Sequence, residues 1–539
     1  MKWRNFFNFW RNSLTDTPTE TDLKRWAVSE WIEYQAWLFH HSFLTLHEWH
    51  QLRANSLRWK QSPFISVVTP VFNTEPRHLR ECIYSVQTQA YSHWEMCLID
   101  DGSDRTETLA CLQALVDTDP RLRWQRLPHN QGICHATNHA LAMVHGEYVA
   151  FLDHDDRLAA DALYHVAETL RRFPETDIVY SDRDMLSPEG FRYMHLLKPD
   201  WSPETLLSGN YLFHLVVYRR SLLEKLGGVR PTLEGSQDYD LILRATDTQP
   251  QVRHIPKVLY HWRQHGQSIA LEPNVKEYTF LAGLRALEET LARRSLHGTV
   301  SENSTLWRGN YRVQLTPFPS SCYHLENLPT FCNYAQQINH VLTTNPQIEY
   351  LVILGPGVQP LTEEAIPELV SWLQIAEVGM VTGKVLDSQD RLLHAGLVQR
   401  PQGLPLPVYE NFPEETAGYL AVTASIRNVS APHPACCVLR RSVWQRLEGF
   451  DTRYAGSHAL LDFALRALTL GFRTVYTPFA RFGAQDWPYS EMWLETDVHL
   501  FTERWATWLN QGDPYYNSHL TLELADMGLN LHWLAPECE

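Results

Sequence analysis

The run ISVVTPVFN at residues 65–73 and the run WEMCLIDDGS at residues 94–103 decide the fold of this chain. Each run is short and apolar and ends in polar residues, as a buried strand does. Helical patterns follow them at Leu79–Gln89 and Leu109–Val116. Strands that alternate with helices in this way predict an α/β unit with a doubly wound, mostly parallel sheet.

Polar side chains follow three of the predicted strands. In a parallel sheet, ligands bind beyond the carboxyl ends of the strands, so these residues are the first candidates for a site. They are Thr69, Pro70 and Asn73 after the first strand, Asp100 and Asp101 after the second, and Asp153, Asp155 and Asp156 after Tyr148–Leu152.

The segment DHDD at residues 153–156 has three carboxylates in four residues, which repel one another unless a cation or hydrogen-bond donors compensate them. A divalent ion such as Mn²⁺ or Mg²⁺ that bridges a diphosphate would do so. A helix cap, the plainer explanation of an Asp at a strand end, uses only one carboxylate. For Asp100 and Asp101 that alternative stays open, because DDGS is also a good turn and N-cap sequence.

The motif order TPVFN, IDDGS, HNQGICHATNHAL, EYVAFLDHDD, EGSQDYDLILRA and IPKVLYHWRQH over residues 64–270 closely resembles family-2 glycosyltransferases. These are inverting enzymes with a Rossmann-like GT-A fold that use nucleotide sugars. The resemblance implies a UDP- or dTDP-sugar donor whose base bonds to Asp100 or Asp101. It also implies that Thr69, Pro70 and Asn73 line the nucleotide pocket.

The resemblance also implies how the catalytic groups are assigned. Asp153, Asp155 and Asp156 occupy the DxD position, which holds Mn or Mg with the donor ribose and diphosphate. Asp238 matches the base, which takes the proton of a poorly nucleophilic acceptor hydroxyl. Gln237 stands where the family usually has Glu, a mild departure that leaves the base in place.

Other polar residues are candidates for the leaving group and the acceptor. Arg263 and His265 could stabilise charge on the departing nucleotide, although an exposed loop also explains them. Asp182, Asp184 and Trp201 are acceptor candidates. A solvated turn explains the two Asp residues equally well, and the prolines beside Trp201 would by themselves give a rigid loop.

The second half of the sequence is a damaged copy of the first. EYVAFLDHDD at 147–156 reappears as EYLVILGPGV at 349–358, so the strand persists while Gly355, Gly357 and Val358 replace the carboxylates. We therefore expect no metal site in the copy.

The copy has lost the base as well. RRSLLEKLGGVRPTLEGSQDYDLILRA from residue 219 recurs as RRSVWQRLEGFDTRYAGSHALLDFALRA from residue 440, with one extra residue. Asp240 then aligns with Asp462, whereas Asp238 falls on Leu460. No counterpart of TPVFN or IDDGS precedes Tyr350, so the nucleotide-binding part looks shortened or lost. The copy is expected to hold the acceptor glycan or cover a sheet edge, or to give structural support alone.

Composition narrows the class of protein. With 62 acidic and 46 basic side chains, the net charge of −16 argues against a nucleic-acid partner. Nine cysteines without a CxxC pair suit a reduced, cytoplasmic interior. No apolar run approaches the ~18 residues of a membrane span, and no secretory signal is visible.

The first residues carry an aromatic stripe. In MKWRNFFNFWRN, Trp3, Phe6, Phe7 and Trp10 recur at helical spacing among basic residues. Such a helix can lie on the inner face of the plasma membrane through residues 1–14, or its stripe can pack on the protein.

We therefore predict a helical extension at 1–60, a catalytic GT-A domain at 61–300 and a degenerate GT-A-like domain at 301–539. The expected activity is metal-dependent, inverting transfer of a sugar to a lipid-linked bacterial surface glycan such as O-antigen. The alternative is an inactive sugar- or nucleotide-binding scaffold of a polysaccharide assembly complex.

Overall fold

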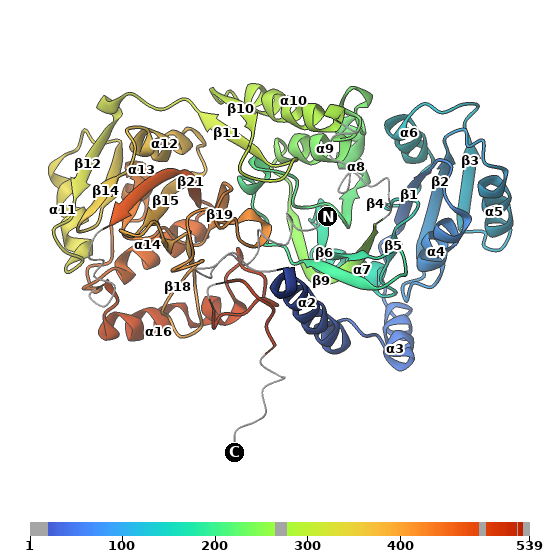
Figure 1. Cartoon of the computed structure of the whole chain (residues 1–539), viewed down its shortest axis with the longest axis horizontal. Coiled ribbons are helices and arrows are strands. Elements are labelled where there is room, and N and C mark those ends of the chain that lie inside the picture. Colours follow the sequence, from blue (N-terminus) through green and yellow to red (C-terminus); the bar gives the residue numbers. More distant parts are fainter. Residues whose placement is uncertain (1–19, 265–276, 485–491, 525, 532–539) are drawn as a thin grey trace, which may run out of the picture. The chain divides into compact units, whose positions relative to one another are not determined.

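The chain forms two compact units, each with its own mixed α/β sheet, which confirms the predicted fold class (Figure 1). The first unit contains Val28–Trp201 and Asn210–Thr290, and the second contains Ser202–Gly209 and Leu291–Glu539. The computed structural model describes residues 20–264, 277–484, 492–524 and 526–531.

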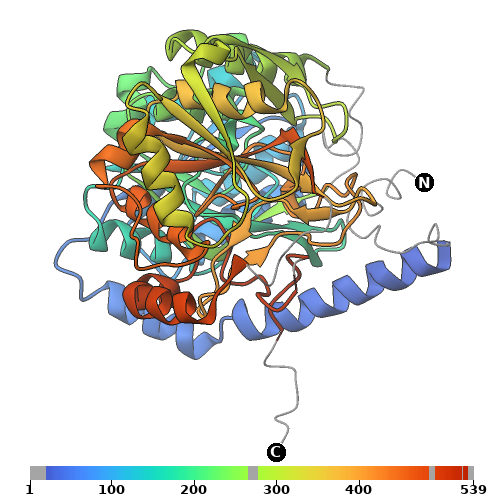
Figure 2. The same cartoon turned by 90° about the vertical axis from the view of Figure 1, so that its left-hand side faces the viewer.

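The region predicted as a helical extension contains two described helices, α2 (Glu20–His41) and α3 (Leu46–Ser56). Figure 2 shows α2 as one long helix in blue. A capping box starts α3, because the Thr45 hydroxyl accepts the N–H of Glu48 at 3.2 Å while the Glu48 carboxylate accepts the N–H of Thr45 at 2.8 Å.

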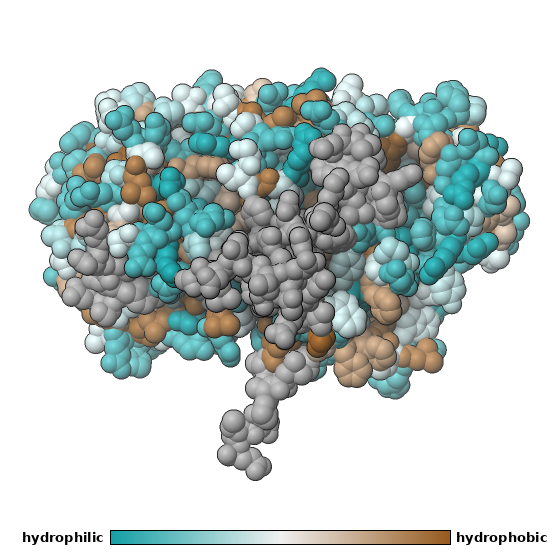
Figure 3. Space-filling model, in the orientation of Figure 1, coloured by the Kyte–Doolittle hydropathy of each residue, from teal (hydrophilic) through white to brown (hydrophobic). Residues whose placement is uncertain are grey.

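Helix α2 is apolar on two sides. Tyr34 and Trp37 are buried, whereas Phe39 is 74% exposed, as is Phe43 just after the helix at 64%. Figure 3 shows brown side chains gathered over this end of α2 and the start of α3. The aromatic stripe and the membrane contact predicted for residues 1–14 lie outside the described residues.

The first sheet has the strand order β3-β2-β1-β4-β8-β6-β9-β5, with β7 paired to β6. β1 to β4 pair in parallel, and β8 runs antiparallel to both of its neighbours. β1 and β2 are buried along their whole length, as inner strands of a covered sheet are. The strands are β1 (Ile65–Val71), β2 (Trp94–Asp100), β3 (Leu122–Arg126), β4 (Tyr148–Phe151), β5 (Arg157–Leu158), β6 (Ile178–Leu186), β7 (Arg192–Leu196), β8 (Val216–Arg219) and β9 (Val252–Arg263).

Helices connect these strands. They are α4 (Pro76–Gln87), α5 (Thr106–Val116), α6 (Ile133–Met143), α7 (Ala162–Arg172), α8 (Arg220–Leu226), α9 (Gln237–Thr246) and α10 (Glu277–Arg293), with 3₁₀ turns η1 (Thr205–Leu207) and η2 (Pro231–Leu233).

The second sheet has the order β12-β13-β20-β15-β21-β14, with β16 and β19 paired to β15 and β21. Its strands are β12 (Tyr323–Asn327), β13 (Tyr350–Leu354), β14 (Val358–Pro360), β15 (Val378–Leu386), β16 (Leu392–His394), β19 (Arg427–Val429), β20 (Cys436–Arg440) and β21 (Arg473–Ala484). Two hairpins, β10 (Gly298–Glu302) with β11 (Tyr311–Leu315) and β17 (Leu397–Val398) with β18 (Leu406–Pro407), stand apart.

The second unit also contains helices and short 3₁₀ turns. They are α11 (Tyr334–Thr344), α12 (Ala365–Ser371), α13 (Arg441–Arg446), α14 (His458–Thr469), α16 (Glu495–Gln511), η3 (Ser320–Cys322), η4 (Trp372–Gln374) and η5 (Tyr419–Ala421).

The two sheets share six strands in the same order and directions. β1-β4-β8-β6-β9-β5 corresponds to β12-β13-β20-β15-β21-β14, and every parallel or antiparallel pairing agrees. The first sheet adds β2 and β3 at one edge, whereas in the second sheet β12 is the edge strand. The structure thus confirms a second, reduced copy, and what it lacks is the part that carries IDDGS.

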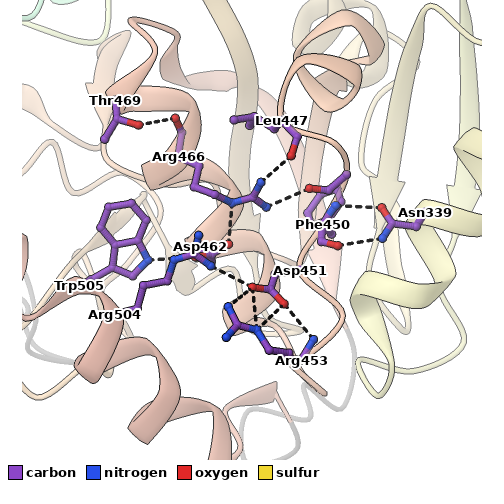
Figure 4. Close-up of polar contacts among 11 residues, drawn as sticks. Asn339, Leu447, Phe450, Asp451, Arg453, Asp462, Arg466, Thr469, Arg504 and Trp505 are labelled. Atoms are coloured by element: carbon purple, nitrogen blue, oxygen red, sulfur yellow. Dashed lines mark hydrogen bonds and ion pairs between the residues drawn. The ribbon is translucent and has the colours of Figure 1, made fainter.

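A buried Asp–Arg pair recurs in both units, and Figure 4 shows the pair of the second unit. Asp240 accepts from Arg244 at 2.8 Å, and Asp462 accepts from Arg466 at 2.8 Å, each one helical turn apart. Each arginine also donates to two carbonyl oxygens at the end of the preceding helix. The acceptors are Leu226 and Gly228 in the first unit, and Leu447 and Gly449 in the second. Because the pair survives in the copy without the catalytic residues, it serves the fold.

A second shared contact fixes the same region. The Asn138 side-chain amide bonds to both backbone groups of Val229, and that of Asn339 does the same with Phe450. These matched bonds equate α6 with α11, so the copy passes from β12 straight to its α6 equivalent.

Candidate active site

The ends of β1 and β2 are tied together by backbone and side-chain bonds. The N–H of Asn73 donates to Ser103 Oγ at 2.8 Å, and Asn73 Oδ1 accepts the N–H groups of Asp104 and Arg105 at 3.1 Å. Asn73 has a left-handed φ of 47°, a conformation that Asn tolerates better than most residues. Asn73 therefore shapes the predicted nucleotide pocket through its backbone and side chain together.

Asp100 and Asp101 are buried and already have partners. Asp101 accepts the N–H groups of Gln131 and Gly132, both at 2.9 Å, and so holds the turn that begins α6. Asp100 pairs with Arg126 at 3.2 Å. The turn-and-cap alternative thus describes Asp101 well.

Thr69 offers an unused donor at the same strand ends. Its Oγ1 is buried and has no hydrogen-bond partner in the described part of the chain, while Pro70 beside it is buried within β1. A buried hydroxyl without a partner is costly, and a bound ligand or water would relieve that cost.

The three carboxylates of DHDD differ in exposure. The side chains of Asp153 and Asp155 are 40% and 15% exposed, whereas Asp156 is fully buried. The Asp156 oxygens accept the Tyr260 hydroxyl and the N–H of Arg263, both at 2.6 Å. Asp156 therefore positions the loop, and its assignment as a metal ligand stays a prediction.

Tyr260 organises the loop that carries these carboxylates. Its hydroxyl donates to Asp156 and accepts the N–H of Asp153 at 3.2 Å. The imidazole of His214 stacks on its ring, with centroids 4.7 Å apart, and places Nε2 3.8 Å from Asp153 Oδ2. Sequence reasoning missed Tyr260 and His214, since neither belongs to a polar cluster.

Arg263 does not face a leaving group. Its guanidinium is buried, donates to the Asp155 carbonyl at 2.7 Å and pairs with Glu81 at 2.5 Å. A paired, buried cation supports the loop rather than contacting a solvent-reachable diphosphate, so the predicted role is corrected. His265 lies outside the described residues.

Asp238 lies in the first turn of α9, and its side chain is exposed. Asn210 Nδ2 donates to Asp238 Oδ2 at 3.0 Å. Removal of hydration by the surrounding protein raises the pKa of Asp238 above its usual value. The carboxylate is therefore reachable and more basic than an ordinary surface Asp.

Asp153, Asp155 and Asp238 lie close enough to interact electrostatically. Desolvation, followed by the charges of Asp155 and Asp238, raises the pKa of Asp153 to about 7. At 40% exposure, water screens part of this effect. The fold thus brings Asp238 close to Asp153 and Asp155, from which it is distant in sequence.

The predicted acceptor residues Asp182 and Asp184 lie inside the sheet, on β6. Asp184 pairs with Arg192 and His261, both at 2.6 Å, and Asp182 accepts from His254 at 2.9 Å. Fully buried and paired carboxylates cannot touch a glycan directly, so both are corrected to supporting positions. Trp201 is partly buried, and its contact with an acceptor stays a prediction.

The described residues contain no group of three or more His, Cys, Asp or Glu side chains placed to hold a metal by themselves. Asp153 and Asp155 nevertheless fit an ion that takes its remaining ligands from water and a diphosphate, as Mg²⁺ commonly does. Desolvation and then the charges of Asp155 and Asp238 raise the pKa of Asp153, and a bound cation would offset both effects.

The equivalent position in the second unit is apolar. A Cβ on Gly355 would lie 2.9 Å from the ring of Phe331, and Leu460 is buried in the core. This packing fills the place of the carboxylates and explains why the copy folds without a charged site.

The sheet order with its strand-end carboxylates and the exposed Asp238 define a GT-A type of transferase domain. Residues 66–227 match the model described as "Glycosyl transferase family 2", and this part of the chain belongs to that family. In the described part of the chain, no helix is both long and apolar enough to cross a membrane.

Curated relatives extend the likeness beyond that domain. The chain is 30% identical to uncharacterized protein y4gI of Sinorhizobium fredii, over 88% of this chain and 59% of that protein. It is 30% identical to O-antigen biosynthesis protein RfbC of Myxococcus xanthus, over 88% of this chain and 42% of that protein. Chondroitin synthase of Escherichia coli is 27% identical over 41% of this chain and 32% of its own length. The chain thus spans about half the length of the first two relatives.

Solved structures give weaker matches. The S. aureus TarS fragment 1–349 in complex with UDP-GlcNAc is 20% identical, with a TM-score of 0.36, over 42% of this chain and 66% of that one. The mannosyltransferase PcManGT of Pyrobaculum calidifontis, in complex with GDP-Man and Mn²⁺, is 20% identical, with a TM-score of 0.33, over 50% and 85%.

Proposed function

We propose that this chain transfers a sugar from a nucleoside-diphosphate sugar to a hydroxyl of a growing bacterial surface glycan, with inversion at the anomeric carbon. The observation that carries the proposal is the convergence of the exposed Asp238 with Asp153 and Asp155. The equivalent positions in the second unit are apolar or glycine. Carboxylates that are present in one copy and replaced by glycine or apolar residues in the other are not needed for the fold, which favours a catalytic or binding role for them.

Asp238 acts as the general base. An acceptor hydroxyl must lose its proton as it attacks, and a carboxylate with a raised pKa takes that proton more readily than an ordinary one. Asp153 and Asp155 would hold Mn²⁺ or Mg²⁺, which when bound would neutralise charge on the leaving diphosphate. Asp156, Tyr260 and Arg263 hold the loop that presents those two carboxylates.

The donor is a UDP- or dTDP-sugar. Thr69, Pro70, Asn73, Asp100 and Asp101 surround the strand ends where its nucleoside binds, with the unpaired Thr69 hydroxyl available to it.

The acceptor is a glycan, and we infer a lipid-linked one at the inner face of the plasma membrane. The name of the Myxococcus relative, O-antigen biosynthesis protein, supports a surface glycan. The exposed apolar side of α2 is compatible with a peripheral position at that membrane.

Donor turnover tests the proposal. Purified protein with Mn²⁺ or Mg²⁺ is expected to release nucleoside diphosphate from at least one sugar in a panel of nucleotide sugars, given a suitable glycan acceptor. Asp155→Ala and Asp238→Asn should each abolish transfer, and Asp238→Asn should still bind donor. Failure of the wild-type chain with every donor and acceptor would favour the inactive scaffold instead.

A further inference from the structure

The loop between η1 and β8 contains Asn210, whose side-chain amide contacts the proposed base, Asp238. Asn210 Nδ2 donates to Asp238 Oδ2 at 3.0 Å. In the described part of the chain, no cationic side chain pairs with Asp238. In the part of the chain that the structure describes, its side-chain hydrogen-bond partner is thus Asn210, a neutral donor.

The orientation of the Asn210 amide is set by its second bond. Oδ1 of Asn210 accepts the N–H of Leu212 at 3.3 Å, so the NH₂ end must face Asp238. The loop is itself held by a buried lysine, since Lys198 Nζ donates to the carbonyl oxygens of Leu212 and His214, both at 2.8 Å. These bonds explain how Lys198 can have no exposed surface.

Other titratable groups that face Asp238 do not compete for this position. Burial raises the pKa of Cys134 on α6 to about 12 and raises that of Tyr218 on β8, so both are neutral near pH 7. Asp153 is another neighbour, and its carboxylate repels Asp238 when it is ionised. Asn210 is therefore the side chain that attracts and orients the carboxylate.

The copy has lost both partners together. Counting back nine residues from Arg219 reaches Asn210, and counting back nine from Arg440, its equivalent in the shared Arg-Arg-Ser, reaches Ala431. Leu460 stands at the position of Asp238. The Asp240–Arg244 pair, which serves the fold, was kept in the same segment. The second unit thus lacks the equivalents of both Asn210 and Asp238, although it retains the residues that stabilise the fold.

We propose that Asn210 is a positioning residue that holds one oxygen of Asp238 and so aims the carboxylate at the acceptor hydroxyl. This inference rests on the proposed function of Asp238. It predicts that the NH₂ donor of Asn210, and not its shape, is what transfer requires.

The variant Asn210→Asp distinguishes the effect of the NH₂ hydrogen-bond donor from the effect of side-chain size. The variant keeps the size and the acceptor for the Leu212 N–H, but it loses the donor and places a second carboxylate against Asp238. Since general base catalysis contributes roughly 10²- to 10⁴-fold, we expect kcat to fall at least ~10-fold. KM for the donor and the melting temperature should stay near wild type. Asn210→Ser, which keeps a short hydroxyl donor, should retain more kcat than Asn210→Asp.

Asn55→Ala is the matched control, because Asn55 donates to the Tyr164 hydroxyl at 2.7 Å, outside the site. It should leave kcat unchanged. A wild-type kcat in Asn210→Asp would overturn the inference. Equal losses of kcat in Asn210→Asp and Asn210→Ser, together with a lowered melting temperature, would also overturn it, because they would indicate a purely structural role. An active Asp238→Asn would instead overturn the assignment of the base, which separates the two failures.

Discussion

Asp153 shows how neighbouring charge controls a metal ligand. Its pKa is raised to about 7 by desolvation and by Asp155 and Asp238, so protons compete with a cation in the physiological range. We expect the affinity for Mn²⁺ in the presence of UDP to fall as pH drops below about 7, by up to ~10-fold per pH unit. Calorimetry at pH 6, 7 and 8 measures this. Equal affinity at all three values would contradict the assignment of Asp153.

His254 gives a pH dependence of a different sign. Its ring bonds to Asp182 and Asp200, both at 2.9 Å, and these carboxylates outweigh burial and raise its pKa to about 9. The unfolded value is about 6.5, so the stabilisation is complete below pH ~6.5 and is lost as pH rises through about 9. The melting-temperature difference between wild type and His254→Gln should therefore shrink between pH 6.5 and 9.5. A constant difference would show that His254 does not titrate there.

Some residues of the candidate site could be identified from the sequence, and others could not. The cluster of Asp153 and Asp155 was visible as charge at a strand end. Asp156 could not be distinguished from them, because its burial depends on Tyr260, a residue 104 positions away. Asn210 lies between elements in an uncharged stretch, and only its replacement by Ala431 in the copy could have drawn attention to it.

At the scale of elements, helix α2 is fixed by a few polar contacts. The Tyr34 hydroxyl donates to Asp184 at 2.7 Å, where Arg192 and His261 also bond. Tyr34→Phe should lower the free energy of unfolding by about 1–2 kcal/mol, since it removes one buried bond to a charged acceptor that keeps two others. Urea unfolding measures the loss. Tyr84→Phe, at a residue that is 65% exposed, should change nothing, and a similar loss there would remove the special role of Tyr34.

The alternation of strands and helices could be read from sequence because short apolar runs and capped helical patterns are local features. The strand pairings of β8 could not, since β8 runs antiparallel between β4 and β6, and this order depends on contacts across the sheet. The two halves match in sequence at β4 and β13. The loss of β2 and β3 from the second half is seen only in the structure, where β12 is an edge strand.

At the scale of the whole molecule, the two units differ in what they can bind. Within the described residues, the second sheet retains six strands of the first and contains no equivalent of β2 or β3, whose ends carry Asp100, Asp101 and the turn to α6. In place of the DxD carboxylates it has Gly355 packed against Phe331. In its described part, the second unit thus lacks the strand ends and carboxylates that we propose bind the nucleotide in the first unit.

We accordingly expect one UDP, or one dTDP, to bind per chain in the presence of Mn²⁺. Calorimetric titration of the full chain should give a stoichiometry near one, and Asp155→Ala should weaken that single event without revealing another. The control is Asp462→Asn, which alters the Asp–Arg pair of the second unit. This variant should lower the stability of the protein while leaving the binding stoichiometry at one. Two equivalents of nucleotide per chain would mean that the reduced sheet has kept a binding site by other residues.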